Sequence, residues 1–271
     1  MKKTKARRFY DSLIEQVKTN KSCFAVFVAL RVAIIAVLVR SIFAGRYENV
    51  FTCFLALTLF LAPPFIEKKL KIQLPTVLES IAYIFIFCAE ILGEIEGFYV
   101  KFPFWDTMLH TVNGFIFAAV GFCLLDIFNR TPNVKFSLSP KFLAIVAFCF
   151  SMTIGVLWEF FEYGMDLLFQ LDMQKDFFID TIGSVKFDSS GGNTPGIITE
   201  IEKTILYLKS GETLEFEKYL DIGLKDTMKD LFVNCIGAVV FSIVGYCYIR
   251  QRGKGKVASQ FIPVLKEEEN V

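Results

Sequence analysis

Six apolar runs, each about 20 residues long, constrain the fold of this chain more than any other feature. A helix rises about 1.5 Å per residue, so a run of this length crosses the ~30 Å of hydrocarbon in a bilayer. The mean hydropathy of +0.50 and the 31 phenylalanines agree with this argument. The sequence therefore predicts an all-α polytopic membrane protein, with the lipid bilayer as its partner. The six transmembrane helices are expected at residues 24–44, 50–66, 77–97, 104–128, 142–169 and 227–249.

Positive charges are unevenly distributed along the chain and predict its orientation. Lysines and arginines gather before run one, between runs two and three, between runs four and five, and after run six. The short connections on the other side contain only Arg46 and Lys101. The positive-inside rule therefore places both termini in the cytoplasm. The basic N-terminus has no small-residue cleavage motif after it, so we expect a retained segment and not a signal peptide.

These boundaries predict five regions. They are a cytoplasmic N-terminal segment (1–23), spans one to five (24–169), an extracytoplasmic segment (170–225), span six (226–250) and a cytoplasmic tail (251–271). The extracytoplasmic segment combines an alternating apolar run near residues 177–187, the turn-rich DSSGGNTPG, the amphipathic ITEIEKTILYL and the strand-like GETLEFEKYL. We expect it to form a small α/β cap. It contains no cysteine, so packing must hold it together.

Composition excludes several kinds of site. The basic residues do not follow an aromatic-studded face, so no nucleic-acid partner is expected. All seven cysteines lie in or beside apolar runs without CxxC spacing, which indicates small buried hydrophobes. A single histidine excludes HExxH, and the chain has no GxSxG or Walker-type glycine loop. The sequence therefore identifies no catalytic residue.

Carboxylates interrupt the apolar runs near one end of four predicted helices. In the fifth run, three of them recur at spacings of three and four, which places them on one helical face. Charged side chains are costly in hydrocarbon, so we expect this face to meet a protein interior or a water-filled cavity. Alternating helix directions bring the ionisable residues of spans three to six to the same outer depth. The candidate cation-binding residues are His110, Glu159, Glu162, Asp230, Asp106, Asp166 and Asp226.

The only histidine, His110, lies four residues after Asp106. One nitrogen among many oxygens suits a divalent cation of the Mn, Fe, Mg or Ca type better than a closed zinc site. Four-helix di-metal carboxylate proteins use Glu-x-x-His pairs, whereas Glu159 and Glu162 form a Glu-x-x-Glu pair, so a di-iron oxidase is not expected. A structural reading stays open: His110 fits a hydrogen-bonded core residue, and Asp106 and Asp226 fit first-turn or N-cap acids.

The chain also contains a weak internal repeat. Asp106-Thr-Met-Leu-His110 begins span four, Asp226-Thr-Met-Lys-Asp230 begins span six, and an asparagine and a glycine follow each. We interpret this as a duplicated helical hairpin, spans three to four and five to six, with the acidic site between the halves. Small residues let membrane helices approach closely. The glycines expected to do so are Gly114, Gly121, Gly155 and Gly237.

The segments WDTMLHTVNG, LWEFFEYGMD and DTMKDLFVNCIGA resemble the motifs of the YjdF-like family of bacterial inner-membrane proteins. Those motifs are a WD/H helix, a WE..E helix and a D...D...N..G helix, and the resemblance covers spans three to six. It implies a bacterial cell membrane. The family is uncharacterised, so the resemblance supplies no activity, cofactor or catalytic residue.

Three functional hypotheses stay open. In the first, the acidic residues bind or move a divalent cation or protons, because close carboxylates cannot all stay charged without a counter-ion. In the second, the chain is a membrane enzyme that acts on lipid or envelope precursors with a carboxylate-bound metal. In the third, it is a scaffold or sensor whose acids form structural ion pairs. The candidate basic partners are Arg31, Arg40 and Lys229.

Overall fold

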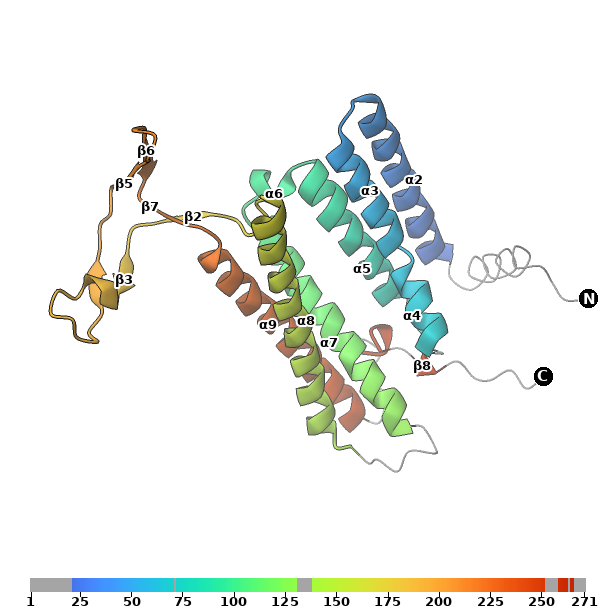
Figure 1. Cartoon of the computed structure of the whole chain (residues 1–271). Coiled ribbons are helices and arrows are strands. Elements are labelled where there is room, and N and C mark those ends of the chain that lie inside the picture. The colour runs from blue at the N-terminus through green and yellow to red at the C-terminus, as the bar shows by residue number, and fades with distance from the viewer. Residues whose placement is uncertain (1–20, 71, 131–137, 252–257, 263, 266–271) are drawn as a thin grey trace, which may run out of the picture. The chain divides into compact units, whose positions relative to one another are not determined.

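The computed structural model describes residues 21–70, 72–130, 138–251, 258–262 and 264–265 (Figure 1). Within them, six helices are long and apolar enough to cross a membrane, which confirms the all-α polytopic prediction. The chain divides into two compact units, one of residues 1–155 and 233–271 and the other of residues 156–232. Below, these are called the bundle unit and the insert unit. The predicted N-terminal segment lies mostly outside the described residues.

The helices follow the predicted spans within a few residues. Span two breaks near Pro63 and Pro64, because proline cannot donate the backbone hydrogen bond that a continuous helix needs. Span three widens from an α-helix into a π-helix in its second half. The helices are α2 (Lys21–Phe43), α3 (Tyr47–Leu59), α4 (Ala62–Leu70), α5 (Thr76–Ile86), the π-helix η1 (Phe87–Ile95), the short α6 (Phe98–Lys101), α7 (Trp105–Arg130), α8 (Pro140–Phe169) and α9 (Leu224–Arg250).

The long helices present apolar side chains outward and polar or small ones inward. On α9, Asp230 and Asn234 are each only 1% exposed, whereas Phe232 and Ile243 are 66% and 58% exposed. A water-soluble helix shows the opposite pattern. Exposed apolar faces with internally satisfied backbone are what hydrocarbon solvent requires. The arrangement therefore fits a bundle whose outer surface contacts lipid.

The C-terminal segment packs on the bundle unit instead of leaving it. Strand β8 (Val264–Leu265) pairs antiparallel with β1 (Ile72–Gln73), which follows α4. Just before it, after the 3-10 turn η3 (Ala258–Gln260), the ring of Phe261 lies 5.1 Å from that of Phe115 in α7. The sequence predicted only a cytoplasmic tail here. Its apolar FIPVL sequence explains why it packs against the core.

Residues 170–223, which join α8 to α9, form β-hairpins and not the expected α/β cap. Their regular elements are β2 (Phe177–Ile179), β3 (Ile182–Ser184), the 3-10 turn η2 (Val185–Phe187), β4 (Gly196–Ile198), β5 (Lys203–Tyr207), β6 (Thr213–Glu217) and β7 (Tyr219–Asp221). The amphipathic stretch expected to contribute the α part contains β5, which pairs with β6 over five residues. Cross-strand pairing of its β-branched and aromatic residues decides this conformation.

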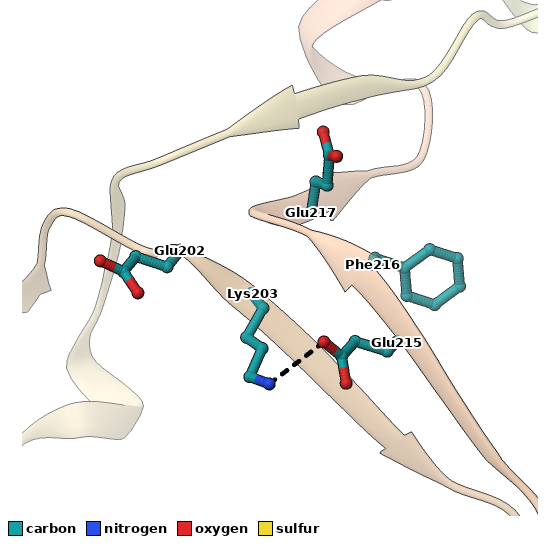
Figure 2. A pocket seen from close by; sticks show the side chains of 5 residues that line it. All are labelled: Glu202, Lys203, Glu215, Phe216 and Glu217. Atoms are coloured by element: carbon teal, nitrogen blue, oxygen red, sulfur yellow. Dashed lines mark hydrogen bonds and ion pairs between the residues drawn. The ribbon is translucent and has the colours of Figure 1, made fainter.

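The β5–β6 hairpin bears a shallow depression on its surface (Figure 2). Lys203 Nζ lies 3.1 Å from Glu215 Oε1 across the two strands. Both side chains are more than half exposed. Solvated ion pairs of this kind contribute little to stability or recognition, so we place no site here.

Protonation of the Asp176 carboxylate, beside β2, makes the stability of the insert unit depend on pH. The loss of some of its hydration, together with the negative charges of Asp172, Asp166 and Asp221, raises the pKa of Asp176 above its usual value of 3.8, although the side chain stays largely exposed. The folded state therefore holds this proton more tightly than the unfolded state, and the stability contributed by the protonated form is lost as pH rises through the raised pKa.

We therefore expect the amide protection factors of β2 and β7 to fall as pH rises from below 3.8 to neutrality, by a small amount because Asp176 is exposed. In Asp176→Asn the decrease in protection that Asp176 causes should disappear. The protection factors are measured by hydrogen exchange and corrected for the pH dependence of the intrinsic exchange rates. Glu212→Gln, in the β5–β6 turn, is the control that should keep the wild-type profile, and an unchanged profile in Asp176→Asn would contradict the assignment.

Candidate functional site

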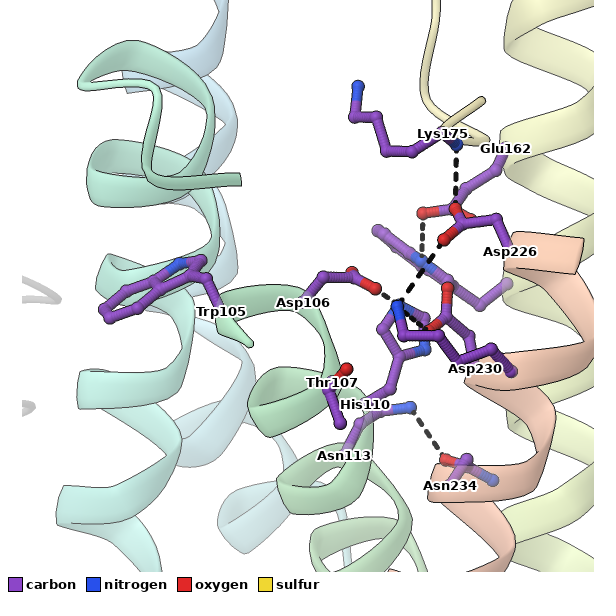
Figure 3. A network of polar contacts seen from close by, with 12 residues as sticks. Trp105, Asp106, Thr107, His110, Asn113, Glu162, Lys175, Asp226, Asp230 and Asn234 are labelled. Atoms are coloured by element: carbon purple, nitrogen blue, oxygen red, sulfur yellow. Dashed lines mark hydrogen bonds and ion pairs between the residues drawn. The ribbon is translucent and has the colours of Figure 1, made fainter. Parts of the chain in front are cut away.

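The first turns of α7 hold an acid and the single histidine close together. Asp106 Oδ1 lies 3.4 Å from His110 Nε2, and the two side chains are 17% and 11% exposed (Figure 3). Their spacing of four residues places them on one helical face. The neighbouring Trp105 donates its indole N–H to the carbonyl oxygen of Cys88 in η1 at 3.3 Å, which ties the start of α7 to span three. The predicted proximity of Asp106 and His110 is therefore present in the bundle unit.

Two glycines let α7 and α9 touch along their backbones. A Cβ atom on Gly114 would lie 2.0 Å from the carbonyl oxygen of Asn234, and one on Gly237 would lie 2.0 Å from that of Thr111. Further along, a Cβ on Gly245 would meet the ring of Phe122. The Gly245–Phe122 contact lies further along both helices than the first two contacts, so α7 and α9 are parallel at this crossing.

Polar side chains of three helices meet at the crossing. Asn113 donates its amide N–H to Asn234 Oδ1 at 3.3 Å (Figure 3). The hydroxyl of Ser151 in α8 donates to the carbonyl oxygen of Gly114 at 2.7 Å. Gly155 packs against the Asn234 side chain. The prediction that Gly114, Gly155 and Gly237 permit close approach is confirmed. Gly121, the fourth, packs against Phe150.

The other five candidate residues belong to the insert unit. Glu159 and Glu162 lie on one face of α8 and are 4% and 8% exposed. Trp158 donates its indole N–H to Glu162 Oε1 at 2.8 Å, so the tryptophan orients this carboxylate. Between the two acids, the ring of Phe160 is 66% exposed. The helix therefore turns its acidic face inward and its aromatic face outward, as spacings of three and four predict.

Asp166 has a capping role. Its two carboxylate oxygens accept the backbone N–H groups of Met173 and Gln174 at 2.6 and 2.9 Å. Gln174 in turn donates its side-chain amide to the hydroxyl of Thr227 at 2.6 Å. These bonds tie the end of α8 to the beginning of α9. A carboxylate occupied in this way is a poor ligand, so we separate Asp166 from the candidate set.

Asp226 and Asp230, one turn apart on α9, share the ammonium group of Lys229. Lys229 Nζ lies 3.7 Å from Asp226 Oδ1 and 3.5 Å from Asp230 Oδ1. The second oxygen of Asp226 accepts the backbone N–H of Lys175 at 2.7 Å (Figure 3). The side chains of Asp226 and Asp230 are 5% and 1% exposed, and that of Lys229 is 30% exposed. One lysine thus lies beside two buried carboxylates.

The arginines considered as partners for the acids have other contacts. The guanidinium of Arg40 lies 2.5 Å from Glu96 Oε1, and that of Arg31 stacks over the ring of Phe27 at 4.6 Å. Sequence reasoning identified Lys229 as a candidate and missed the Trp105 and Trp158 indole bonds. Indole donors leave no spacing signal of their own. The sequence does show a tryptophan directly before an acid in WDTMLH, and one four residues before an acid in WEFFE.

Comparison with known proteins gives a family without an assigned activity. The model of the family described as "Predicted membrane protein (DUF2238)" matches residues 26–251. A relative from Thermotoga maritima, described as "Uncharacterized protein", is 27% identical over 143 residues, which cover 52% of this chain and 71% of the relative. No solved structure matches. The family match runs from within α2 to the end of α9 and agrees with a resemblance to uncharacterised membrane proteins.

Proposed function

The chain belongs to the DUF2238 family of predicted membrane proteins, and from this premise we propose that it binds or moves a divalent cation or protons through buried carboxylates. The observation that carries the proposal is the Asp106–His110 pair, which is nearly inaccessible to solvent in a helix of membrane-spanning length. Ionisable side chains in such segments are rare and mark ion pathways or binding sites.

Helix periodicity supports adding Asp230 to this pair. Helix α9 is unbroken from Leu224 to Arg250, and Asp230 precedes Asn234 by four residues, so it lies about one 5.4 Å turn further along the same face. His110 precedes Gly114 by the same interval in α7. In the repeated segments that begin spans four and six, Asp230 occupies the position that corresponds to His110. Asp106, His110 and Asp230 would offer a carboxylate, an imidazole and a second carboxylate.

The donor set favours hard or borderline cations. Carboxylate oxygens with one imidazole nitrogen suit Mn²⁺, Fe²⁺, Mg²⁺ or Ca²⁺ better than Zn²⁺ in a closed thiolate-rich site. Glu159, Glu162 and Asp226 are further candidate oxygen ligands. Lys229 neutralises part of this charge, so a bound cation competes with the ammonium group for Asp230. The carboxylates therefore have a positive partner in both states, which is the ammonium group without a bound cation and the cation when one is bound.

One observation favours a second function, a structural ion-pair scaffold. Lys229 lies near both Asp226 and Asp230 on the same helix, so these two acids already have a structural ion-pair partner. Under that proposal the acids serve assembly alone and bind no cation. Measuring whether the purified protein binds a cation distinguishes these two proposals.

We likewise propose that the protein lies in a bacterial inner membrane with both termini in the cytoplasm, as the basic flanking segments and the likeness to the YjdF-like proteins indicate. In this orientation the beginnings of α7 and α9 and the β-hairpins of residues 170–223 face outward. The acidic residues then lie in the outer half of the bilayer, from which an external cation reaches them without crossing the whole membrane.

Elemental mass spectrometry of detergent-purified protein, loaded with Mn²⁺ and washed in chelator-free buffer, tests the proposal. We expect about one ion per chain in the wild type, and at least tenfold weaker Mn²⁺ binding in Asp230→Asn and in His110→Gln, because each removes a ligand. Glu212→Gln, which removes an exposed carboxylate from a turn of the insert unit, is the control and should bind as wild type. Equal Mn²⁺ content in wild type and both ligand variants, all equally folded, would refute a cation site at these residues.

A further inference from the structure

A second polar pocket lies in the bundle unit, where α2 ends, α3 begins and η1 ends. Its volume is about 260 Å³, smaller than most drug-sized ligand sites. Two arginines, a serine, an asparagine and a glutamate contribute its polar groups. The lining residues are Arg40, Ser41, Ala44, Arg46, Asn49, Ile95 and Glu96.

A buried hydroxyl points to a ligand in this pocket. Ser41 is 1% exposed and its Oγ has no hydrogen-bond partner among the described residues. A buried hydroxyl that makes no hydrogen bond destabilises the folded protein, so such groups are normally satisfied by a ligand, an ion or water. The hydroxyl is therefore a donor or acceptor available to a bound molecule.

The beginning of α3 provides further donors at the same place. Arg46 is its N-cap, and no side chain caps this end of the helix. The first N–H groups of a helix have no intrahelical partner, and the helix dipole adds a partial positive charge there. Asn49, in the first turn, lines the pocket. Helix beginnings of this kind bind anions, phosphate groups in particular.

Charge in the pocket is also positive. Arg40 donates to Glu96 Oε1 at 2.5 Å, which fixes the orientation of the guanidinium and leaves its other N–H groups available. The Arg46 side chain is exposed and makes no ion pair within the described part of the chain. Two guanidinium groups beside one carboxylate leave one net positive charge. The planar fork of arginine matches the oxygens of a phosphate in bidentate geometry.

We propose that this pocket binds a phosphate group, carried either by a phospholipid headgroup or by free phosphate. Arg40 and Arg46 supply the charge, Ser41 supplies a hydroxyl hydrogen bond, and the beginning of α3 supplies backbone N–H groups. The pocket lies at the ends of membrane-length helices, where the headgroups of a bilayer are found, so a lipid reaches it from within its leaflet. The site uses none of the residues proposed to bind the cation and stands independently of that proposal.

Two ligands distinguish the sources, each tested on the full chain purified in detergent free of phosphate. The first is phosphatidylglycerol, with diacylglycerol as the matched lipid that lacks the phosphate, and its retention is measured by native mass spectrometry. The second is inorganic phosphate, titrated by calorimetry and used as a competitor of the lipid. The variants are Arg40→Gln with Arg46→Gln, and Ser41→Ala. The charge-matched control is Lys203→Gln with Lys209→Gln, which removes two exposed lysines from the insert unit.

We expect the wild type to retain phosphatidylglycerol and not diacylglycerol. The double arginine variant should bind at least tenfold more weakly, Ser41→Ala severalfold more weakly, and the lysine control as wild type. Retention of the lipid against excess inorganic phosphate would assign the site to a headgroup. Binding of inorganic phosphate that displaces the lipid would assign it to free phosphate.

Equal retention in wild type and the double arginine variant, or binding of neither ligand by the wild type, would overturn the proposal. Thermal melting and size-exclusion chromatography check that the variants fold. Should the double variant fail to fold, Arg46→Gln alone replaces it, because that side chain is exposed and makes no ion pair in the described structure. Its binding should still fall about tenfold, and an unchanged affinity would count equally against the site.

Discussion

Replacing Gly114 by alanine is expected to destabilise the protein by about 2–3 kcal/mol, a large effect for one methyl group. The added Cβ would lie 2.0 Å from the carbonyl oxygen of Asn234, well inside van der Waals contact. The obstructing atom belongs to the backbone of α9, so no side-chain rotation relieves the clash and the helices must separate. Separation would also stretch the Asn113–Asn234 and Ser151–Gly114 hydrogen bonds. Thermal melting in detergent measures the loss.

Gly164, in the same class of apolar helix, provides the matched control. A Cβ on Gly164 would meet nothing within 4 Å, so alanine there should leave the melting temperature unchanged or raise it by an amount equivalent to at most ~1 kcal/mol of helix propensity. Gly237→Ala should behave like Gly114→Ala, because its Cβ would strike the carbonyl oxygen of Thr111 at the same short distance. A Gly114→Ala protein that melts with wild type and Gly164→Ala would disprove the close crossing of α7 and α9.

The glycine crossing illustrates what the sequence predicts well in this fold. Apolar runs of membrane-spanning length predict the six helices. The thickness of the hydrocarbon layer sets the length of a spanning helix, and an unpaired backbone in hydrocarbon excludes other conformations. The repeated Asn and Gly in spans four and six indicated where two helices touch, because close backbone approach requires the absence of a side chain. Both expectations depend on local sequence alone.

The β-hairpins and the packed C-terminal segment depend on contacts distant in sequence. Strand β5 has the composition of an amphipathic helix as well as of a strand, and pairing with β6 decides between them. Strand β8 pairs with β1 nearly two hundred residues earlier, and a two-residue ladder leaves no periodic signal. The π-helix of span three likewise has no periodic signal in the sequence.

For the candidate site, the sequence predicted the burial of the residues more accurately than their roles. Glu159, Glu162 and Asp230 are as inaccessible as an inward helical face requires. Asp166, on the same face of α8, caps backbone N–H groups of the residues that follow the helix. A loop that folds back to meet a carboxylate is a tertiary event, and spacing within the helix carries no information about it.

Replacing Lys229 by methionine should distinguish cation binding from structural ion pairing. Methionine keeps an unbranched apolar stem as far as Cε and removes the ammonium group that lies 3.5 Å from Asp230 and 3.7 Å from Asp226. Without a cation, two buried carboxylates lose their neighbour, and we expect a loss of about 1–3 kcal/mol, below the value for a fully buried pair because Lys229 is partly exposed. Cation binding should tighten about tenfold, because an ammonium group no longer competes for the ligands.

The matched control is Lys225→Met. Lys225 and Lys229 both lie over the ring of Phe177, at 5.2 and 5.6 Å, but only Lys229 pairs with the two aspartates. Melting temperatures with and without Mn²⁺, together with Mn²⁺ titrations, give both quantities for each variant. If the acids form a cation site, Mn²⁺ should restore the stability of Lys229→Met, and Lys225→Met should resemble wild type throughout. If the acids only pair with Lys229, the variant should stay destabilised at every Mn²⁺ concentration, because no other cation can then take the place of the ammonium group.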